Sequence, residues 1–574
     1  MPLQKILFKP GVNRENTRYT TEGGWYECDK IRFRQGNPEK IGGWTPFAGG
    51  TFLGICRSLW NWVILAAENL VGVGTNLKFY ILKGGAYFDI TPIRKTETLI
   101  NPFTATDGSS VITINEANHG CVDGDTVIYS GAGIVGLGGN ITASVLTGAF
   151  QITYVTDDVY TIDVGVAANA ADVAGSPGGG SVVTQYEINT GASYQVPLVG
   201  WGAGPWGLGT WGNGQETSTS LQLWSQQNFG EDLVYGPRGQ GIYYWNANIG
   251  YSPIQVTITI AAPGVVTLPA GFYFPDGTAI SFTSTGALPT GLTVGQPYFV
   301  VNSTGGTFEL SNTINGPSIT TSGSQSGLQY ISARGVDLAD AGDADTPLFQ
   351  NVIQVSDIYR FVLVFGTNDY GATYLDPMLI RWSDQEDPYT WTPAATNQAG
   401  SLRLSHGSAI QTVVQTRQEM VVFTDSSIYS LQYVGAPYVW TAQLLGDNVS
   451  IVGPNAAVVA SGRVFWMGVD KFYVYDGRVQ TLNCDLRRYV FQDFNALQSQ
   501  QVYCSTNEGF NEVWWFYCST DSLTIDRYVV YNYMENIWYY GNMARTAWLD
   551  SGLLPYPIAA TYNQELVQHE DGVD

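Results

Sequence analysis

Residues 420–432 read MVVFTDSSIYSLQ: an apolar strand, a short polar turn and a second strand in which apolar and polar residues alternate. A continuous apolar run is typical of an inner strand buried on both faces, whereas alternation is typical of a half-exposed strand. Two such strands joined by a polar turn predict an antiparallel hairpin.

The same pattern recurs in five further stretches, often with a tryptophan or an Asp-Gly turn. Because repeated hairpin units are the sequence signature of propeller blades, the pattern predicts an all-β fold, a β-propeller. The further copies are Trp62–Leu82, Asp232–Trp245, Arg360–Trp382, Val464–Leu482 and Val513–Trp538.

Two stretches rich in Gly, Thr, Ser and Val interrupt the repeats, at 101–183 and at 253–334. They resemble each other: DGDTVIYSGAG (123–133) matches DGTAISFTSTG (276–286), and a second pair of similar strands follows in the same order. We interpret them as two copies of one small β-sandwich or barrel module inserted into propeller loops. Convergence of Thr- and Gly-rich strands by composition is the alternative.

At 574 residues the chain exceeds one ordinary core, since a domain usually has about 100–200 residues. The predicted boundaries are 1–45 for a basic N-terminal docking segment, 46–100 for the first part of the propeller, 101–183 for the first inserted module, 184–252 for the continued propeller with a Gly/Trp loop, 253–334 for the second inserted module, and 335–574 for the remaining blades.

The Gly/Trp loop reads VGWGAGPWGLGTWGNG (199–214). Glycine permits close backbone approach, and tryptophan is a frequent anchor in protein interfaces. Trp201, Trp206 and Trp211 are therefore candidates for an interface loop. The alternative is that they fold back onto the edge of their own blade.

Charge is unevenly distributed. The net charge is -23, yet eight of the 26 Lys and Arg residues fall within the first forty residues. The acidic remainder of the chain argues against nucleic-acid binding, because binding to phosphates needs clustered positive charge. The same acidic remainder would repel DNA that slides through an enclosed channel. Only 13% of residues are charged, so the surface is largely neutral, which favours burial against other subunits. A stable extracellular β protein is the alternative.

Few residues could support catalysis or bind a cofactor. His119, His406 and His569 are far apart, the cysteines match no zinc spacing, and the glycine runs lack a phosphate-binding pattern. We therefore expect no enzyme activity and no cofactor. The N-terminus has no signal-peptide pattern and the apolar stretches are of strand length, so we expect no membrane insertion.

Two motifs leave alternatives open. Ser383–Trp391 resembles the Asp-box turn of sialidase-like propellers, which keeps glycoside hydrolysis under consideration. DLADAGDADTP (337–347) could supply carboxylates to a calcium ion or could be a solvated acidic linker.

The opening of the chain carries four motifs: FKPGV (8–12), EGGWY (22–26), DKIRFR (29–34) and KIGGW (40–44). This opening resembles the tail-hub or nozzle proteins of short-tailed bacteriophages, including those named packaged-DNA stabilisation proteins. The resemblance implies a propeller subunit in a six-fold ring, a homohexamer, below the portal and the tail adaptor. Such a ring extends the DNA channel, helps to retain the packaged genome and carries tail fibres or spikes.

The resemblance also implies a location in the virion tail, with synthesis and assembly in the host cytoplasm. DNA would pass through the channel without specific binding. A glycan-binding or glycan-cleaving receptor protein of the tail is the alternative function.

We expect the basic opening to dock onto the adaptor or onto the next subunit. The alternative is an ordinary first blade whose charges are solvated. A propeller also needs a strand to close its ring, and here either an N-terminal strand or residues beyond the given sequence would supply it. The candidate docking residues are Lys5, Lys9, Arg14, Arg18, Trp25, Lys30, Arg32, Arg34 and Trp44.

Overall fold

The computed structural model describes residues 8–17, 19–169, 177–195 and 221–572. Within these residues, seven four-stranded antiparallel sheets form the blades of a propeller. The predicted all-β propeller with two inserted modules is therefore confirmed. No helix in the described part of the chain is long and apolar enough to cross a membrane.

Blades 1 to 3 come from the N-terminal half of the propeller. Their strands, from the innermost outward, are β4 (Cys56–Val63), β5 (Asn69–Thr75), β6 (Phe79–Lys83) and β7 (Ala86–Asp89); β15 (Trp224–Phe229), β16 (Asp232–Pro237), β17 (Tyr243–Trp245) and β24 (Val336–Asp337); and β25 (Val352–Val355), β26 (Val362–Asn368), β27 (Leu375–Trp382) and β28 (Gly400–Arg403).

Blades 4 to 7 follow in the same way. Their strands are β29 (Ile410–Gln415), β30 (Met420–Thr424), β31 (Ser427–Gly435) and β32 (Val439–Asp447); β33 (Ala457–Ala460), β34 (Arg463–Met467), β35 (Phe472–Tyr475) and β36 (Val479–Leu482); β37 (Tyr503–Asn507), β38 (Glu512–Tyr517), β39 (Arg527–Asn532) and β40 (Ile537–Asn542); and β41 (Ala547–Leu549), β42 (Ile558–Ala560), β43 (Leu566–His569) and β3 (Trp44–Pro46).

The innermost strands make the ring. Each packs against the innermost strand of the next blade, from β4 through β15, β25, β29, β33 and β37 to β41, and β41 returns to β4. In five of the six stretches the apolar strand recognised in the sequence is the second strand of its blade; the stretch Trp62–Leu82 instead begins at the end of the innermost strand β4. These second strands are buried on both faces because a neighbouring blade covers each face; β30, for example, is buried at every position.

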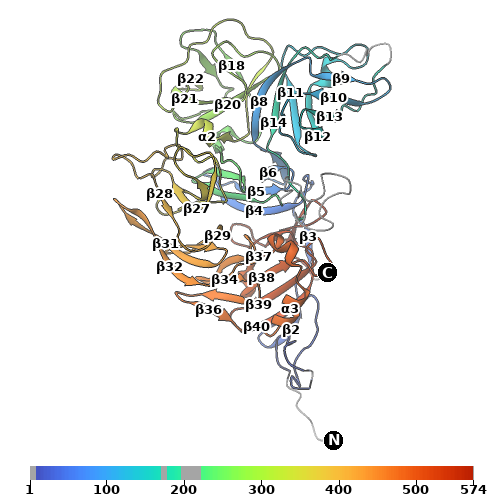
Figure 1. Cartoon of the computed structure of the whole chain (residues 1–574), viewed down its shortest axis with the longest axis vertical. Helices are drawn as coiled ribbons and strands as arrows, with labels where there is room; N and C mark the ends of the chain where they lie inside the picture. Colours follow the sequence, from blue (N-terminus) through green and yellow to red (C-terminus); the bar gives the residue numbers. More distant parts are fainter. Residues whose placement is uncertain (1–7, 18, 170–176, 196–220, 573–574) are drawn as a thin grey trace, which may run out of the picture.

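An N-terminal strand closes the propeller. β3 pairs with β43 in blade 7, with Trp44 opposite His569 and Pro46 opposite Val567. Of the two closure alternatives that the sequence left open, the structure therefore has the first. The last blade combines the two ends of the described chain, and the C-terminus lies beside β3 in Figure 1.

The first inserted module is a curled sheet in the strand order β8-β14-β11-β12-β13-β10-β9, and the second is a closed barrel in the order β18-β19-β22-β21-β20-β23. Their elements are β8 (Ile93–Ile100), β9 (Phe103–Ala105), β10 (Val111–Asn115), β11 (Thr126–Ser130), α1 (Ala143–Leu146), β12 (Gly148–Thr156), β13 (Val159–Asp163) and β14 (Ser181–Glu187); and β18 (Ile254–Ile258), β19 (Val265–Thr267), β20 (Ala279–Ser284), β21 (Pro297–Thr304), β22 (Thr307–Ser311) and β23 (Gln329–Ile331).

The two modules share one topology. When the strands β9 to β14 are matched in chain order with β18 to β23, neighbouring strands in one module correspond to neighbouring strands in the other. In the first module, the strand that closes the barrel is broken into β8 and β9 at Asn101, whose φ of 51° interrupts the extended backbone. The shared order supports duplication over convergence by composition, with the second module a closed barrel and the first a curled, open sheet of the same order.

The first module is longer than the predicted 101–183. β8 pairs with β14 from Ile100 opposite Ser181 to Ile93 opposite Glu187, so a boundary at residue 101 would separate two paired strands. The sequence missed β8 because IRKTETLI continues without a turn from blade 1. The second module, at Ile254–Ile331, follows the expected range closely.

The first module lies in the connection between β7 of blade 1 and β15 of blade 2, and the second lies within blade 2, between β17 and β24. Figure 1 places them side by side at one end of the longest axis, with the N-terminal residues at the other end. The remaining elements are the hairpin β1 (Ile31–Arg34) and β2 (Asn37–Lys40), the helices α2 (Leu338–Ala341) and α3 (Arg487–Asp493), and the 3-10 helices η1 (Ala247–Ile249), η2 (Ala496–Gln501) and η3 (Glu508–Phe510).

Blade packing predicts the effect of Gly74→Val. A Cβ at Gly74 would lie 2.7 Å from ring atoms of Trp224, which is buried between blades 1 and 2. Overpacking of this kind costs about 1–3 kcal/mol, so we expect a lower denaturant midpoint. Gly49→Val is the matched control, because no atom lies within 4 Å of its added Cβ. An unchanged midpoint for Gly74→Val would contradict the packing of these blades.

Candidate docking surface

The described residues between 8 and 46, which we call the clasp, pack on blades 6 and 7. The Val12 amide donates to the carbonyl of Trp538 on β40 at 2.7 Å, and the Val12 side chain is buried. Gly11 has a φ of +85° and lies against Ile537, a position that favours glycine. The opening of the chain is therefore held against its C-terminal half.

Arg32 on β1 is the central contact of the clasp. Its Nε lies 2.9 Å from a carboxylate oxygen of Glu512 on β38, and its Nη2 lies 2.5 Å from Glu570, just after β43. The guanidinium carbon is 3.5 Å from the ring centroid of Phe510. Arg32 and Glu512 are almost completely buried, so one guanidinium joins the clasp to two blades.

Both carboxylates have further donors. Glu512 accepts hydrogen bonds from the Trp514 indole at 2.9 Å and from the Tyr539 hydroxyl. Glu570 accepts from Asn507 at 2.8 Å and from the amide of Gly42 at 3.1 Å. Such complete pairing is what allows charges to remain in a buried site.

The pKa values reflect this pairing. Burial by itself would lower the pKa of Arg32, but the charge of Glu512 and the hydrogen bond to Glu570 outweigh burial and raise it. Burial raises the pKa of Glu512, although Arg32 opposes that shift. The arginine is therefore held in its charged form.

Arg14 is also engaged within the chain. Its Nη2 donates to the Tyr540 hydroxyl at 2.6 Å, and its guanidinium carbon lies 4.1 Å from the ring centroid of Tyr26 and 4.7 Å from that of Tyr489. Trp25 is half-buried and packs on Phe33, with ring centroids 5.9 Å apart.

The docking role predicted for Arg32 is wrong, because its guanidinium is buried against carboxylates of its own chain. Arg14 and Trp25 contribute to the same internal packing. The sequence could not separate these residues from solvated cations, since their partners lie hundreds of positions away: Arg32 and Glu570 are separated by 538 residues.

Lys9, Lys30 and Arg34 are exposed, as expected of docking residues, and Trp44 is 36% exposed on β3. Carboxylates lie among these cations, so the exposed clasp is mixed in charge rather than basic. The exposed acidic residues are Glu15, Glu22, Glu27 and Asp29. The candidates that lie outside the described residues are Lys5, Arg18, Trp201, Trp206 and Trp211.

An open groove of about 410 Å³ borders β3 and contains a cation that the sequence analysis missed. Arg545 is 6% exposed and its Nε donates to Nε2 of His569 at 2.8 Å. Its Nη1 donates to the carbonyl of Ala544, while Nη2 has no hydrogen-bond partner among the described residues. The guanidinium carbon is 4.8 Å from the ring centroid of Trp44.

Within the described residues, Arg545 forms no ion pair with a carboxylate. Burial lowers the pKa of Arg545 to about 10. Burial, followed by the charges of Arg545 and Arg32, lowers the pKa of His569 well below its usual value, so His569 is neutral and accepts the hydrogen bond. Because Nη2 is itself buried, Arg545 stabilises the packing around β3 and does not present a charge to a partner.

Other candidate residues have structural roles. Asp337 caps α2, and Asp343 accepts hydrogen bonds from the amides of Trp391 and Thr392. Among the described residues, no group of three or more His, Cys, Asp or Glu side chains is arranged to hold a metal ion.

Comparisons with known proteins give distant matches only. No protein-family model and no curated protein matches the chain. A virginiamycin B lyase from Staphylococcus aureus is 8% identical, with coverage of 61% of this chain and 97% of that chain and a TM-score of 0.27. The phage phi92 endosialidase is 11% identical, with coverage of 77% and 54% and a TM-score of 0.15. BBS1N, solved in complex with ARL6DN, is 8% identical, with coverage of 88% and 96% and a TM-score of 0.24.

The Arg32 network predicts a large effect of Arg32→Ala. The substitution leaves the carboxylate of Glu512 buried without its cation, and loss of one partner of a buried pair costs about 3–5 kcal/mol. We expect a much lower denaturant midpoint. Arg34→Ala, two residues along the same strand but exposed, is the control and should change stability by less than about 0.5 kcal/mol. Equal effects of the two substitutions would contradict the network.

His569 predicts a pH dependence of stability. Because its pKa is lowered in the folded state, protons bind the unfolded state more strongly, and stability is lost as the pH falls below about 6.5. His569→Gln should make the free energy of unfolding fall less steeply than in the parent protein between pH 7 and pH 5. His406→Gln, at an exposed histidine, is the control. Identical slopes for the parent and His569→Gln would contradict a neutral buried His569.

Proposed function

We propose that this chain is a structural protein of a short phage tail: one subunit of the ring-shaped nozzle below the portal and adaptor. One observation carries the proposal. The four motifs that resemble phage nozzle proteins all contribute to the clasp, through Val12, Trp25, Arg32 and Trp44. The resemblance therefore lies in residues that hold the N-terminal part of the chain against blades 6 and 7.

The arrangement of the molecule is consistent with a subunit that connects two neighbours. The hairpin β1–β2 of the clasp lies toward one end of the longest axis, and the paired modules lie at the other (Figure 1). In the proposed tail, the clasp end contacts the adaptor, and the module end is available to fibres or spikes.

The composition supports a DNA channel formed by several subunits. With a net charge of -23 per chain, a ring of six copies would repel DNA phosphates from its wall, so DNA would pass without specific binding. The six-fold number comes from the resemblance alone.

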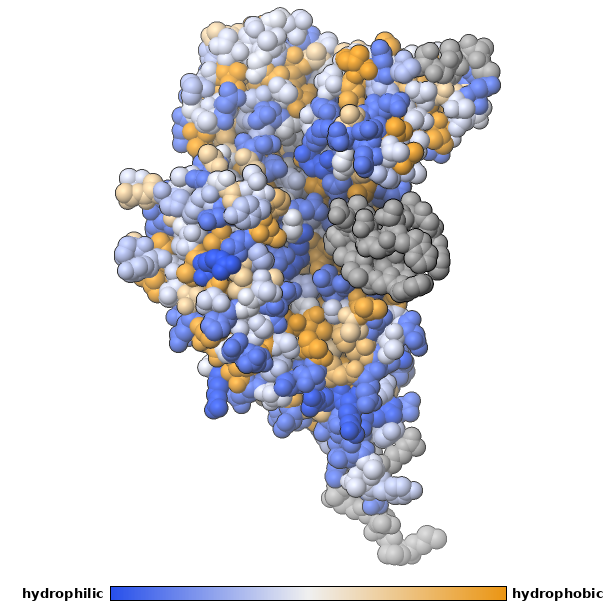
Figure 2. Space-filling view, in the orientation of Figure 1, coloured by the Kyte–Doolittle hydropathy of each residue, from blue (hydrophilic) through white to orange (hydrophobic). Residues whose placement is uncertain are grey.

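The surface has apolar sites for contacts between subunits. Figure 2 shows hydrophobic side chains interspersed with hydrophilic ones over the blades. Large exposed side chains on blades 3 and 4 and their connection include Tyr438, Tyr374 and Ile358, at 79%, 70% and 69% exposure. Exposed aromatic side chains of this kind are frequent at interfaces.

Electron microscopy tests the proposal. The purified chain is mixed with particles that have a portal and an adaptor but no tail. We expect a ring at the portal vertex together with retained DNA. Monomers that do not bind the particles, observed at micromolar concentration and physiological salt, would contradict the proposal.

Charge reversal on the clasp gives a sharper test than truncation, because deletion of residues 1–34 would also remove Val12 and Arg32. The double variant Lys9→Glu, Arg34→Glu changes exposed side chains only. We expect at least tenfold weaker attachment to tailless particles with an unchanged denaturant midpoint. Arg417→Glu, at an exposed arginine between β29 and β30, is the control. Normal attachment of the double variant would exclude these cations as docking residues.

A further inference from the structure

A cleft lined by both hydroxyl-bearing and apolar side chains lies where the two inserted modules meet blade 2. Its volume is about 310 Å³, at the lower end of the range of about 300–1,000 Å³ that is usual for ligand sites. The modules approach each other closely beside it: a Cβ added to Gly295 would lie 2.5 Å from the hydroxyl of Thr96.

Equivalent strands of the two modules form the walls of the cleft. β11 and β14 supply Ser130 and Gln185; the corresponding strand β20 supplies Thr283, and Ser332 directly follows β23. In the sequence match between 123–133 and 276–286, Ser130 aligns with Thr283. Gln185 and Ser332 also occupy equivalent positions in the two modules, because β14 pairs with β11 in the first module as β23 pairs with β20 in the second. The same face of both modules therefore lines one space.

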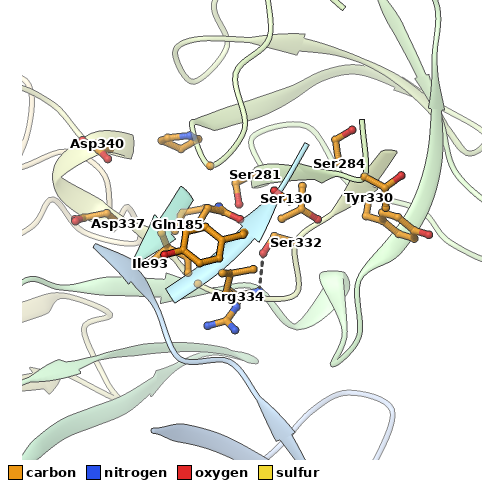
Figure 3. A pocket seen from close by; sticks show the side chains of 18 of the residues that line it. Ile93, Ser130, Gln185, Ser281, Ser284, Tyr330, Ser332, Arg334, Asp337 and Asp340 are labelled. Carbon is orange, nitrogen blue, oxygen red and sulfur yellow. Dashed lines mark hydrogen bonds between the residues drawn. The ribbon is translucent and has the colours of Figure 1, made fainter. Parts of the chain in front are cut away.

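Several hydroxyl groups that line the cleft form no hydrogen bond within the described residues. Within the described residues, the side-chain hydroxyls of Ser130, Ser281, Thr283 and Tyr330 have no hydrogen-bond partner. Figure 3 shows Ser130 and Ser281 beside each other, with Tyr330 on one side of them and Asp337 on the other. A hydroxyl both donates and accepts, so this wall matches a ligand whose groups do the same.

The charges of the cleft exclude anionic ligands. Arg334 is the cation among the described lining residues, and its Nη2 is paired with Glu187 at 2.8 Å. Asp337 and Asp340 lie at the opposite side of the cleft from Tyr330 (Figure 3). Two carboxylates and a neutralised guanidinium disfavour phosphates and acidic sugars.

We propose that this cleft binds a neutral oligosaccharide through one or two sugar rings. Sugar hydroxyls would exchange hydrogen bonds with Ser130, Ser281 and Thr283 and would donate to Asp337, while the ring of Tyr330 offers an apolar face to the sugar C–H groups. The proposal stands on the cleft alone and does not depend on the nozzle function. The residues that line the cleft belong mostly to the modules, which lie at the end of the molecule opposite the hairpin β1–β2 (Figure 1), where the cleft would remain accessible in a particle-bound ring.

Binding of the full chain to immobilised oligosaccharides tests the proposal. The probes are neutral hexose and N-acetylhexosamine oligosaccharides and, in parallel, sialylated and sulfated ones. Hits are measured by isothermal titration calorimetry. We expect binding of at least one neutral oligosaccharide and none of the acidic ones. No neutral binder, or a preference for acidic probes, would overturn the proposal.

Two variants assign the binding to the cleft. Ser130→Trp fills the space between the modules and should weaken binding at least tenfold, whereas Thr283→Val keeps the volume, removes one hydroxyl and should weaken it severalfold. Thr153→Trp, at an exposed position on β12 outside the cleft, is the control and should bind normally. Unchanged binding by both cleft variants would overturn the assignment. Ring formation at the portal vertex is a separate readout, so failure of one proposal is distinguishable from failure of the other.

Discussion

The buried contact of Arg32 with Glu512 and Glu570 is the constraint on which the closed propeller depends. A charge in a dry site is tolerated only when it is fully paired, so these three side chains have to meet. Each belongs to a different part of the chain: the clasp, blade 6 and the end of blade 7. The pairing therefore draws the N-terminal residues onto the last two blades, and this places β3 beside β43.

Closure from the N-terminus has a consequence for function. The cations that most resemble a docking patch in the sequence, Arg14 and Arg32, are used inside the molecule. The charges left for a partner are exposed ones such as Lys9 and Arg34. At the other end, two modules of the same strand order, one before blade 2 and one within it, bring equivalent faces together, and this forms the cleft.

The sequence predicted what local patterns encode. Its six hairpins fall in six separate blades, because a buried second strand next to an alternating strand is readable within about twenty residues. Blade 7 could not be predicted from the sequence. Its strands AWL and IAA are too short to show an alternation of apolar and polar residues, and its outer strand comes from the other end of the chain. The same limit applies to the site: charge can be counted in a sequence, but Glu512 and Glu570 as partners of Arg32 appear only in the fold.

A designed disulfide across β3 and β43 tests the closure most directly. Thr45 faces Gln568 in the antiparallel register, so Thr45→Cys with Gln568→Cys places two thiols within bonding reach. The account predicts that oxidation cross-links each chain to itself, with a higher denaturant midpoint than in the reduced form and no change in the molecular mass under denaturing conditions. Cross-linked dimers or a ladder of larger species would contradict it, because they would mean that the N-terminal strand closes the propeller of a neighbouring chain.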